Sequence, residues 1–588
     1  MRRDRRQFLG FLSGLGLSST LFPGALWALA ADHDEITSAM VEQAARLADI
    51  TLTPEMSDAM LRGLNRQAQS CAALDKVGFR NWDPPATLFN PVLPGMDFPR
   101  ERRPLVVSHI ASPAVPKNLE EVAFYTARQL GELVRRRRVS SLALTEMYLE
   151  RLKRYDPLLK FVITYTTDRA LAQAKEADRD LAAGRYRGPL HGLPWGAKDL
   201  LAVKGYPTTW GALPYKDQML PEDAAVVQRL DAAGAVLIAK LTLGALAQGD
   251  VWFGGITRNP WKPSEGSSGS SAGPASTTAA GCVAFSIGSE TLGSISSPST
   301  RCGATGLRPT FGRVPRTGAM TLSWTFDKLG PICRAVEDCA LVLHAIYGPD
   351  GRDRSVHEIP FNWNAHLPLH EIRVGYLETE FANEGTGHGG PFEEQTPEAR
   401  ARRAEQARFD QRTVETLRRL GVRLIPKTLP EGQAASSRGL IINAEAATAF
   451  DELTQSGRDR MMEGKDNPFP STWPNQFRIA HFLPAVAYLN ANRARLMLME
   501  QMEELFRDID VLVTPTNGPQ LTITNTTGHP ALIQPNGFRA SDGTPTSITF
   551  LGRLFGEEKL CVLGRAYQEA AGFYLRHPPQ FAAKPDES

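Results

Sequence analysis

The chain repeatedly follows a helical stretch with a glycine and then with a short apolar run. VVQRLDAAGAVLIAK (226–240) and TVETLRRLGVRLIP (413–426) both have this order, with the glycine as the helix stop. IRVGYL (372–377) and DVLVTPT (510–516) are further apolar runs bounded by breakers. Helices that alternate with short buried strands predict an α/β fold, in which a mostly parallel sheet is covered by helices on both faces.

The composition is that of a large soluble protein. Apolar residues make up 42% of the 588 residues and charged residues 22%, which excludes collagen, coiled coils, multi-span membrane proteins and wholesale disorder. The formal net charge is only +2, so the chain has no general attraction to nucleic acid or acidic lipid, and we expect no nucleic-acid partner. Six cysteines are too few for a disulfide scaffold, and they lack the CxxC spacing of metal sites.

Residues 1–30 have the layout of an export signal. Four arginines form a basic head, an apolar stretch follows over 8–30, and Ala28-Leu29-Ala30 supplies the small residues that a signal peptidase favours. The order DRRQFLG (4–10) resembles a bacterial twin-arginine signal. A membrane anchor is the alternative, but four glycines and Pro23 make the stretch weakly hydrophobic for a span. We therefore expect a periplasmic or otherwise exported protein, with no stable membrane insertion after signal removal.

Residues 31–118 are predicted to form a helical N-terminal extension with a connector. Thr53-Pro54-Glu55 predicts a helix start, with Thr53 as the cap and Pro54 in the first helical position. Apolar residues follow at helical spacing, namely Met56, Met60, Leu61 and Leu64. Between Asn81 and Pro116 prolines recur and periodicity is lost, which predicts an extended connector wrapped on the next domain. The α/β pattern gives the third predicted region, 119–588.

A serine- and glycine-rich segment spans residues 263–300. Such a bias is typical of a flexible linker, but the segment contains an apolar run, 281–287, that favours burial. A glycine-rich strip inside a core domain could instead present its backbone N–H groups to a ligand oxyanion. Within it, Gly269–Gly273 matches the G-x-S-x-G nucleophile elbow, which would make Ser271 a nucleophile with His529 as its partner. That elbow requires a preceding hydrophobic strand, and PSEGSS predicts none.

Longer motifs around this segment carry a more specific likeness. The stretch Gly255–Arg313 resembles the signature of the amidase signature family, and it aligns without a gap from Asn259 to Gly312. RGPLHGLPWGAKDLLAVKGYPTTWG (187–211) is similar to that family's lysine motif, and DVLVTPT and TNTTGHPALIQPNGF (524–538) resemble its C-terminal motifs. The likeness covers about residues 119–575. It implies the family's fold, with a large mixed, mostly parallel sheet.

The resemblance implies an amide hydrolase with a Ser–cis-Ser–Lys triad. Ser294 would be the nucleophile that forms an acyl-enzyme, Ser270 the bridging serine and Lys198 the base. The oxyanion hole would consist of the backbone N–H groups of Thr291, Leu292, Gly293 and Ser294. Lysine accepts a proton only when it is neutral, so Lys198 must have a lowered pKa. The implied substrate is a small-molecule amide or ester, and the chemistry requires no metal and no organic cofactor.

The motif departs from the family pattern around the nucleophile. Leu292 stands where the family often has a second glycine, and Glu290 and Ser296 stand where it commonly has aspartate and arginine. Arg301 is the candidate replacement for the missing arginine. Two other functions remain open: a non-catalytic binding protein on an amidase scaffold, and the glutaminase component of a transfer-RNA amidotransferase.

The substrate pocket is expected to take its walls from the less familiar stretch between Glu378 and Arg478. Trp473 and Phe477 are the aromatic candidates in that stretch. Ordinary packing of both rings is an equally good interpretation of the sequence.

Overall fold

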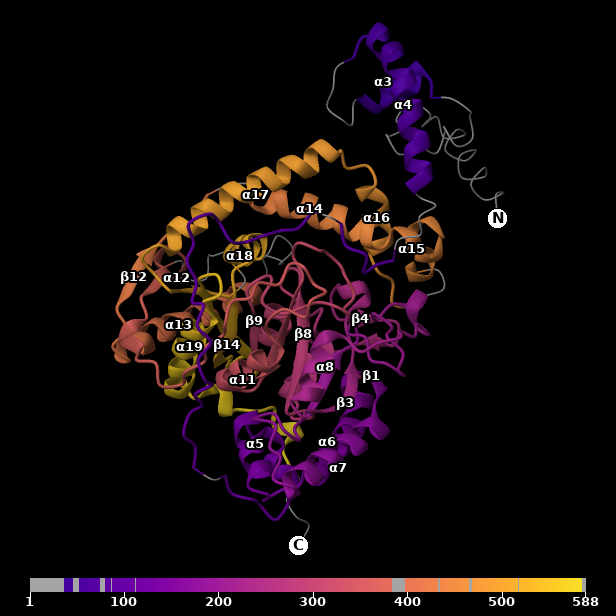
Figure 1. The fold of residues 1–588 in the computed structure, drawn as a ribbon. Helices are drawn as coiled ribbons and strands as arrows, with labels where there is room; N and C mark the ends of the chain where they lie inside the picture. Colours follow the sequence, from indigo (N-terminus) through magenta and orange to yellow (C-terminus); the bar gives the residue numbers. More distant parts are fainter. Residues whose placement is uncertain are drawn as a thin grey trace.

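The computed structural model describes residues 36–45, 52–74, 80–85, 87–111, 113–382, 397–431, 434–464, 468–516 and 518–583. The export signal predicted for residues 1–30 lies outside them. Helices α3 (Ser38–Ala45) and α4 (Pro54–Leu74) form a small unit at the edge of the molecule (Figure 1). Met56 N donates to Thr53 Oγ1 at 3.3 Å, which confirms the predicted helix start. No helix in these described ranges is both long and apolar enough to cross a lipid bilayer.

A single large sheet forms the centre of the remaining chain. In spatial order its strands are β1 (Val162–Tyr165), β3 (Val236–Leu241), β2 (Pro194–Lys198), β8 (Phe285–Glu290), β10 (Lys328–Cys333), β9 (Thr305–Arg308), β14 (Ala531–Phe538), β15 (Pro545–Gly552), β13 (Val511–Pro515), β11 (Val374–Leu377) and β12 (Leu424–Lys427). Two small ribbons pair β4 (Val251–Trp252) with β5 (Gly255–Ile256) and β6 (Arg258–Asn259) with β7 (Lys262–Gly266).

The predicted α/β class and the mixed sheet are confirmed, but the balance of strand directions differs from the expectation. Among the described strands of the large sheet, four neighbouring pairs are parallel and six are antiparallel. The parallel pairs join β3–β2–β8 at one end and β13–β11–β12 at the other. Antiparallel strands fill the middle, because β8, β10, β9, β14 and β15 alternate in direction.

Helices cover the sheet on both sides. Every residue of β2, β3, β8, β10, β14 and β15 is buried, so neither face is open to solvent along these strands. The covering helices are α5 (Ala127–Arg135), α6 (Ser141–Leu159), α7 (Thr167–Ala182), α8 (Ala225–Ala232), α9 (Ala272–Ala279), α10 (Ser296–Cys302), α11 (Val336–Ile346), α12 (Glu378–Ala382), α13 (Pro397–Arg419), α18 (Gln520–Thr527) and α19 (Glu557–Ala571). Near one end of the molecule, α14 (Ala434–Ala449), α15 (Asp451–Gln455), α16 (Trp473–Ala480) and α17 (Ala485–Phe506) form a further layer (Figure 1).

The helix–strand units predicted from the glycine pattern are present. The segment 226–240 forms α8 and β3, and the segment 413–426 holds the end of α13 and the start of β12. The serine- and glycine-rich segment is no linker, because it contains α9, β8 and α10 and is mostly buried. Its apolar run enters the core, where Cys282 and Phe285 are completely buried.

The segment predicted as a connector is mainly extended backbone. Residues 80–85, 87–111 and 113–116 contain no helix or long strand, and this part of the chain runs along the outside of the α/β body (Figure 1). Ser108 N donates to Glu337 Oε1 on α11 at 2.7 Å, and Arg103 N donates to Asn362 Oδ1 at 2.9 Å. The connector is therefore fastened to the body through its own backbone groups.

Candidate active site

Lys198 is the last residue of β2 and is completely buried. Its Nζ donates to Ser270 Oγ at 2.8 Å, to Ser289 Oγ at 2.8 Å and to Ser271 Oγ at 3.1 Å. Burial lowers the pKa of the Lys198 amine well below its usual 10.5, although the negative charges of Asp327 and Glu290 act in the opposite direction. The surroundings of Lys198 thus favour the neutral amine, which is the form that accepts a proton.

The two serine loops predicted to meet are joined through their backbones. The Gly269–Ser270 peptide bond is cis, as the resemblance implied, and Ser270 precedes Ser271, the N-cap residue of α9. Ser271 N donates to Ser294 O at 3.0 Å, so the loop that carries Ser294 is tied to the residue next to Ser270. A Cβ added at Gly269 would lie 1.8 Å from Gly249 O, so this position excludes any side chain.

The loop between β8 and α10 contains the four residues predicted to form an oxyanion hole. Gly293 has a φ of 83°, a left-handed conformation that favours glycine. Among the described residues, the N–H groups of Leu292, Gly293 and Ser294 have no backbone or side-chain acceptor. Leu292, the departure from the family pattern, packs its side chain against a cluster that includes Phe326. These N–H groups are therefore held in place and unused, as an oxyanion site requires.

Glu290 fixes the end of this loop that leads into α10. Its Oε2 accepts from Ile295 N at 2.9 Å and from Ser296 N at 2.8 Å, at the start of α10. Its Oε1 accepts from Arg308 at 2.7 Å and from Asn525 at 2.9 Å. Burial would raise the pKa of Glu290, but Arg308 and these hydrogen bonds hold it at about 2. Glu290 therefore stays ionised and fixes the loop between β8 and α10.

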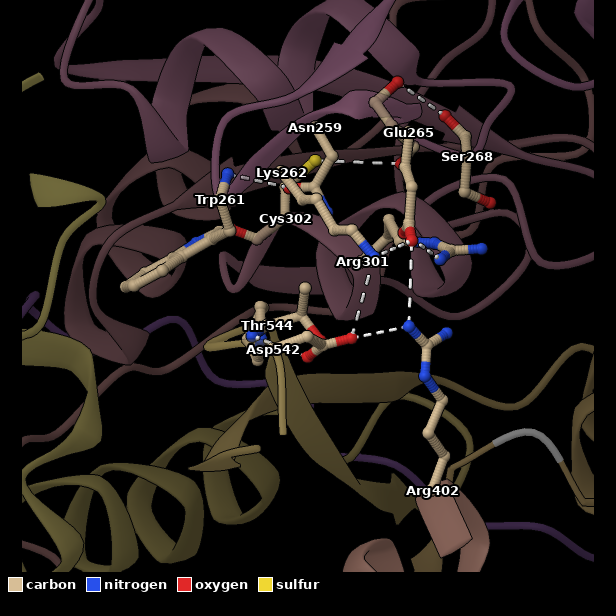
Figure 2. A network of polar contacts seen from close by, with 12 residues as sticks. Asn259, Trp261, Lys262, Glu265, Ser268, Arg301, Cys302, Arg402, Asp542 and Thr544 are labelled. Atoms are coloured by element: carbon tan, nitrogen blue, oxygen red, sulfur yellow. Dashed lines mark hydrogen bonds and ion pairs between the residues drawn. The ribbon is translucent and has the colours of Figure 1, made fainter. Parts of the chain in front are cut away.

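The prediction that Arg301 replaces the family's arginine is wrong. Arg301 points to the surface, where it pairs with Glu265 at 3.0 Å, and Arg402 links the same carboxylate to Asp542 (Figure 2). Arg308 on β9 is the arginine that meets Glu290, and both side chains are completely buried. The sequence does not indicate this pairing, because it depends on the strand order β8–β10–β9 in the sheet.

Arg308→Met is expected to lower the free energy of unfolding by about 3–5 kcal/mol, because the carboxylate of Glu290 would remain buried without its counter-charge. Chemical denaturation followed by tryptophan fluorescence measures this change. Arg301→Met is the matched control, since its ion pair is partly exposed and its loss should cost no more than about 1 kcal/mol. Equal losses in the two variants would contradict the role assigned to Arg308.

The serine of the elbow motif has a different environment from that of a nucleophile elbow. A strand does precede Ser271, contrary to the prediction, but this strand, β7, belongs to a two-stranded ribbon outside the large sheet. Ser271 Oγ donates to Ser289 O and accepts from Ser289 N, each at 3.1 Å. His529 instead shares a hydrogen bond with Thr527 at 2.8 Å, and burial lowers its pKa to about 3. Neither residue is arranged as part of a Ser–His pair.

Sequence reasoning missed Ser289, the third hydroxyl at Lys198. It lies on β8, which pairs in parallel with β2, and the pairing brings it beside the lysine although 91 residues separate them in sequence. Ser289 and Thr291 also line a pocket of about 390 Å³. The expected aromatics do not line this pocket: Trp473 and Phe477 are buried and stacked on each other with their ring centroids 5.0 Å apart. Both rings are buried, which agrees with ordinary packing.

Comparison with known proteins assigns the family. A family model described as Amidase matches residues 143–522, more than half of the chain. The chain belongs to the amidase signature family. This amidase-family enzyme, of a class that acts on carbon–nitrogen bonds, carries Lys198, Ser270 and Ser294 inside the matched range.

Several relatives of this amidase-family chain cover it over most of its length. "Putative amidase AmiD" of Mycobacterium tuberculosis is 34% identical over 502 residues, which span 80% of this chain and 99% of the relative. A glutamyl-tRNA(Gln) amidotransferase subunit of Methylococcus capsulatus is 30% identical over 501 residues, 78% of this chain and 99% of the relative. The native peptide amidase from Stenotrophomonas maltophilia has a similar structure, with a TM-score of 0.68, 29% identity and coverage of 79% of this chain and 100% of that chain.

Proposed function

We propose that this chain hydrolyses a carboxylic amide, and with the same groups an ester, through an acyl-enzyme on Ser294. The observation that carries this proposal is the fully buried Lys198, whose Nζ lies 2.8 Å from Ser270 Oγ and whose pKa is lowered by burial. A neutral lysine beside one serine can accept, through that serine, the hydroxyl proton of a second serine. The backbone hydrogen bond from Ser271 N to Ser294 O keeps Ser294, the second serine, close.

The reaction begins with attack of Ser294 Oγ on the carbonyl carbon of the amide. The hydroxyl proton passes to Ser270, and Ser270 gives its own proton to Lys198. The carbon–nitrogen bond then breaks, the leaving nitrogen takes a proton back along the same path, and ammonia or an amine departs. Water attacks the acyl-enzyme by the same proton route, which releases the acid and restores the Ser294 hydroxyl.

The oxyanion formed in each attack requires donors that are in place before the reaction. The N–H groups of the loop 291–294 suit this role, because Leu292, Gly293 and Ser294 have no acceptor among the described residues. Glu290 and Leu292 hold the loop from opposite sides, through the start of α10 and through the cluster with Phe326. Loss of one oxyanion donor typically costs about 2.7–4 kcal/mol of transition-state stabilisation.

Incubation with a panel of carboxamides and with a fluorophosphonate tests the proposal. We expect release of ammonia or amine and one covalent phosphonyl adduct per chain. A chain that shows neither would be a non-catalytic binding protein on this scaffold. Glutamine belongs in the panel because relatives include amidotransferase subunits named for glutamyl-tRNA(Gln); hydrolysis confined to glutamine would favour that second function.

The proposed place of action is outside the cytoplasm, on the strength of the twin-arginine-like order at residues 4–10. Fractionation of bacterial cells that produce the full chain is expected to recover it in the exported fraction. Replacement of Arg5 and Arg6 by lysine should retain it in the cytoplasm. Recovery of both forms in the cytoplasm would contradict the export proposal without touching the catalytic one.

A further inference from the structure

The pocket beside the proposed base is built from two distant parts of the chain. Its floor belongs to the α/β body: Ser289 and Thr291 from the end of β8, Leu200 and Ala202 after β2, and Met320. Met320 N donates to Leu200 O and Ala202 N donates to Gly318 O, each at 2.9 Å, so the floor is rigidly bonded. Since Ser289 Oγ lies 2.8 Å from Lys198 Nζ, this floor is one hydrogen bond away from the proposed base.

The outer wall of the pocket comes from the connector, in a segment that we call the strap (residues 80–85 and 87–89). The lining residues of the strap are Arg80, Trp82, Asp83, Pro84, Pro85, Thr87, Leu88 and Phe89. The strap lies outside the family match at 143–522, so the family pattern does not predict this wall.

The strap is fastened at both ends. Asn81 Nδ2 donates to Thr321 O, and Thr321 N donates to Asn81 Oδ1, both at 2.9 Å, so the asparagine pairs with the pocket floor as a strand would. At the other end Phe89 packs edge-on against Phe311, with the ring centroids 5.0 Å apart, and it also lies under the guanidinium of Arg495. Between these attachments, Trp82 and Leu88 keep 39% and 47% of their surfaces exposed.

The formal charges of the residues that line the pocket cancel, because four arginines (Arg80, Arg316, Arg352 and Arg354) stand against four carboxylates (Asp83, Glu222, Asp327 and Asp353). Arg80 pairs with Asp83, Arg352 with Glu222, and Arg316 with Asp353, with N–O distances of 2.7–3.0 Å. Asp327 accepts from Thr291 Oγ1 and from the backbone N–H groups of Leu322 and Ser323. Part of the lining is apolar, with aromatic side chains from Trp82, Phe89, Trp210 and Trp324.

Building on the proposed function, we infer that this pocket holds a neutral aromatic or bulky aliphatic substituent of the amide substrate, and that Trp82 and Leu88 of the strap determine this preference. A volume of about 390 Å³ exceeds the roughly 150 Å³ that is enough for a benzene ring. Three of the four lining arginines are already paired with carboxylates, and the fourth, Arg354, is exposed to solvent, so a charged substituent gains little, whereas the exposed faces of Trp82 and Leu88 gain by contact with an apolar group.

The test compares three substrates in the full chain: acetamide, 4-phenylbutyramide with the ring on the acyl side, and N-benzylacetamide with the ring on the amine side. Trp82→Ala should lower kcat/KM about tenfold to a hundredfold, and Leu88→Ala about tenfold, for at least one of the ring-bearing amides. Acetamide should change less than about twofold. The ring-bearing substrate whose kcat/KM falls shows whether the acyl side or the amine side of the amide occupies the pocket.

Leu158→Ala is the matched control, because Leu158 on α6 is 48% exposed and does not line the pocket. Equal loss on all three substrates, or no loss on either ring-bearing amide, would overturn the inference. The rate of fluorophosphonate labelling, which should stay unchanged, shows that each variant is folded. A parent chain that hydrolyses nothing and is not labelled would refute the proposed function instead, so the two failures are distinguishable.

Discussion

Ser294→Ala is expected to abolish fluorophosphonate labelling and to lower kcat for amide hydrolysis by a factor on the order of 10⁴–10⁶. The alanine removes the oxygen that is proposed to bond to the acyl group, while the backbone of the loop is retained. Ser294 contributes its backbone carbonyl to the bond from Ser271, and alanine retains that carbonyl. Intact-protein mass spectrometry after labelling, together with ammonia release from an amide, measures both effects.

Ser271→Ala is the comparison variant, since the G-x-S-x-G match at Gly269–Gly273 made Ser271 the alternative nucleophile. Its hydroxyl bonds to the backbone of Ser289 and to Lys198, so alanine should weaken the support of the base and reduce the rate while labelling persists. The assignment of the nucleophile fails if the adduct survives in Ser294→Ala and disappears in Ser271→Ala.

Lys198→Met is expected to lower kcat/KM by about 10²–10⁴-fold, the usual contribution of a general base. In the parent chain the activity should rise with pH as the Lys198 amine loses its proton, because only the neutral amine accepts the proton of the serine pair. Burial lowers the pKa of this amine well below 10.5, so the rise should be complete well below pH 10.5. A pH profile of kcat/KM measures the position of this rise.

The methionine variant should lose that rise along with the rate. Ser289→Ala is the matched control: it removes one of the three hydroxyls at the amine and leaves the base in place, so we expect about a tenfold loss. A methionine variant that retains the pH-dependent rise, or more than a tenth of the activity, would contradict the role of Lys198.

Local patterns were sufficient for individual elements. The glycine stops near Gly234 and Gly421 predicted α8 with β3 and the order of α13 and β12, because a helix end and a buried strand are each encoded within a few residues. Strand direction is not encoded within a few residues, and the expectation that most neighbouring strands are parallel was wrong. One antiparallel pair did have a local signal: β14 and β15 are joined by a turn with Asp542-Gly543, a typical hairpin pair.

For the candidate site too, local motifs predicted some residues, and others became evident only from the fold. Two long motifs gave Lys198 and Ser270, and the structure places them 2.8 Å apart. Ser289 and Arg308 were missed because their contacts depend on which strands are neighbours in the sheet. The strap was not foreseen as a pocket wall, because its attachment depends on Asn81 contacting Thr321 and Ala449, which are 240 and 368 residues away in sequence.

The attachments of the strap and its exposed side chains belong to different residues. Asn81 and Phe89 hold the strap to the body, whereas Trp82 and Leu88, which lie between them, stay partly exposed. Substitutions between the two attachment points would then alter the lining of the pocket without loosening its wall and without reaching the serine–lysine centre. In such a chain, the choice of amide and the rate of bond cleavage are able to change independently.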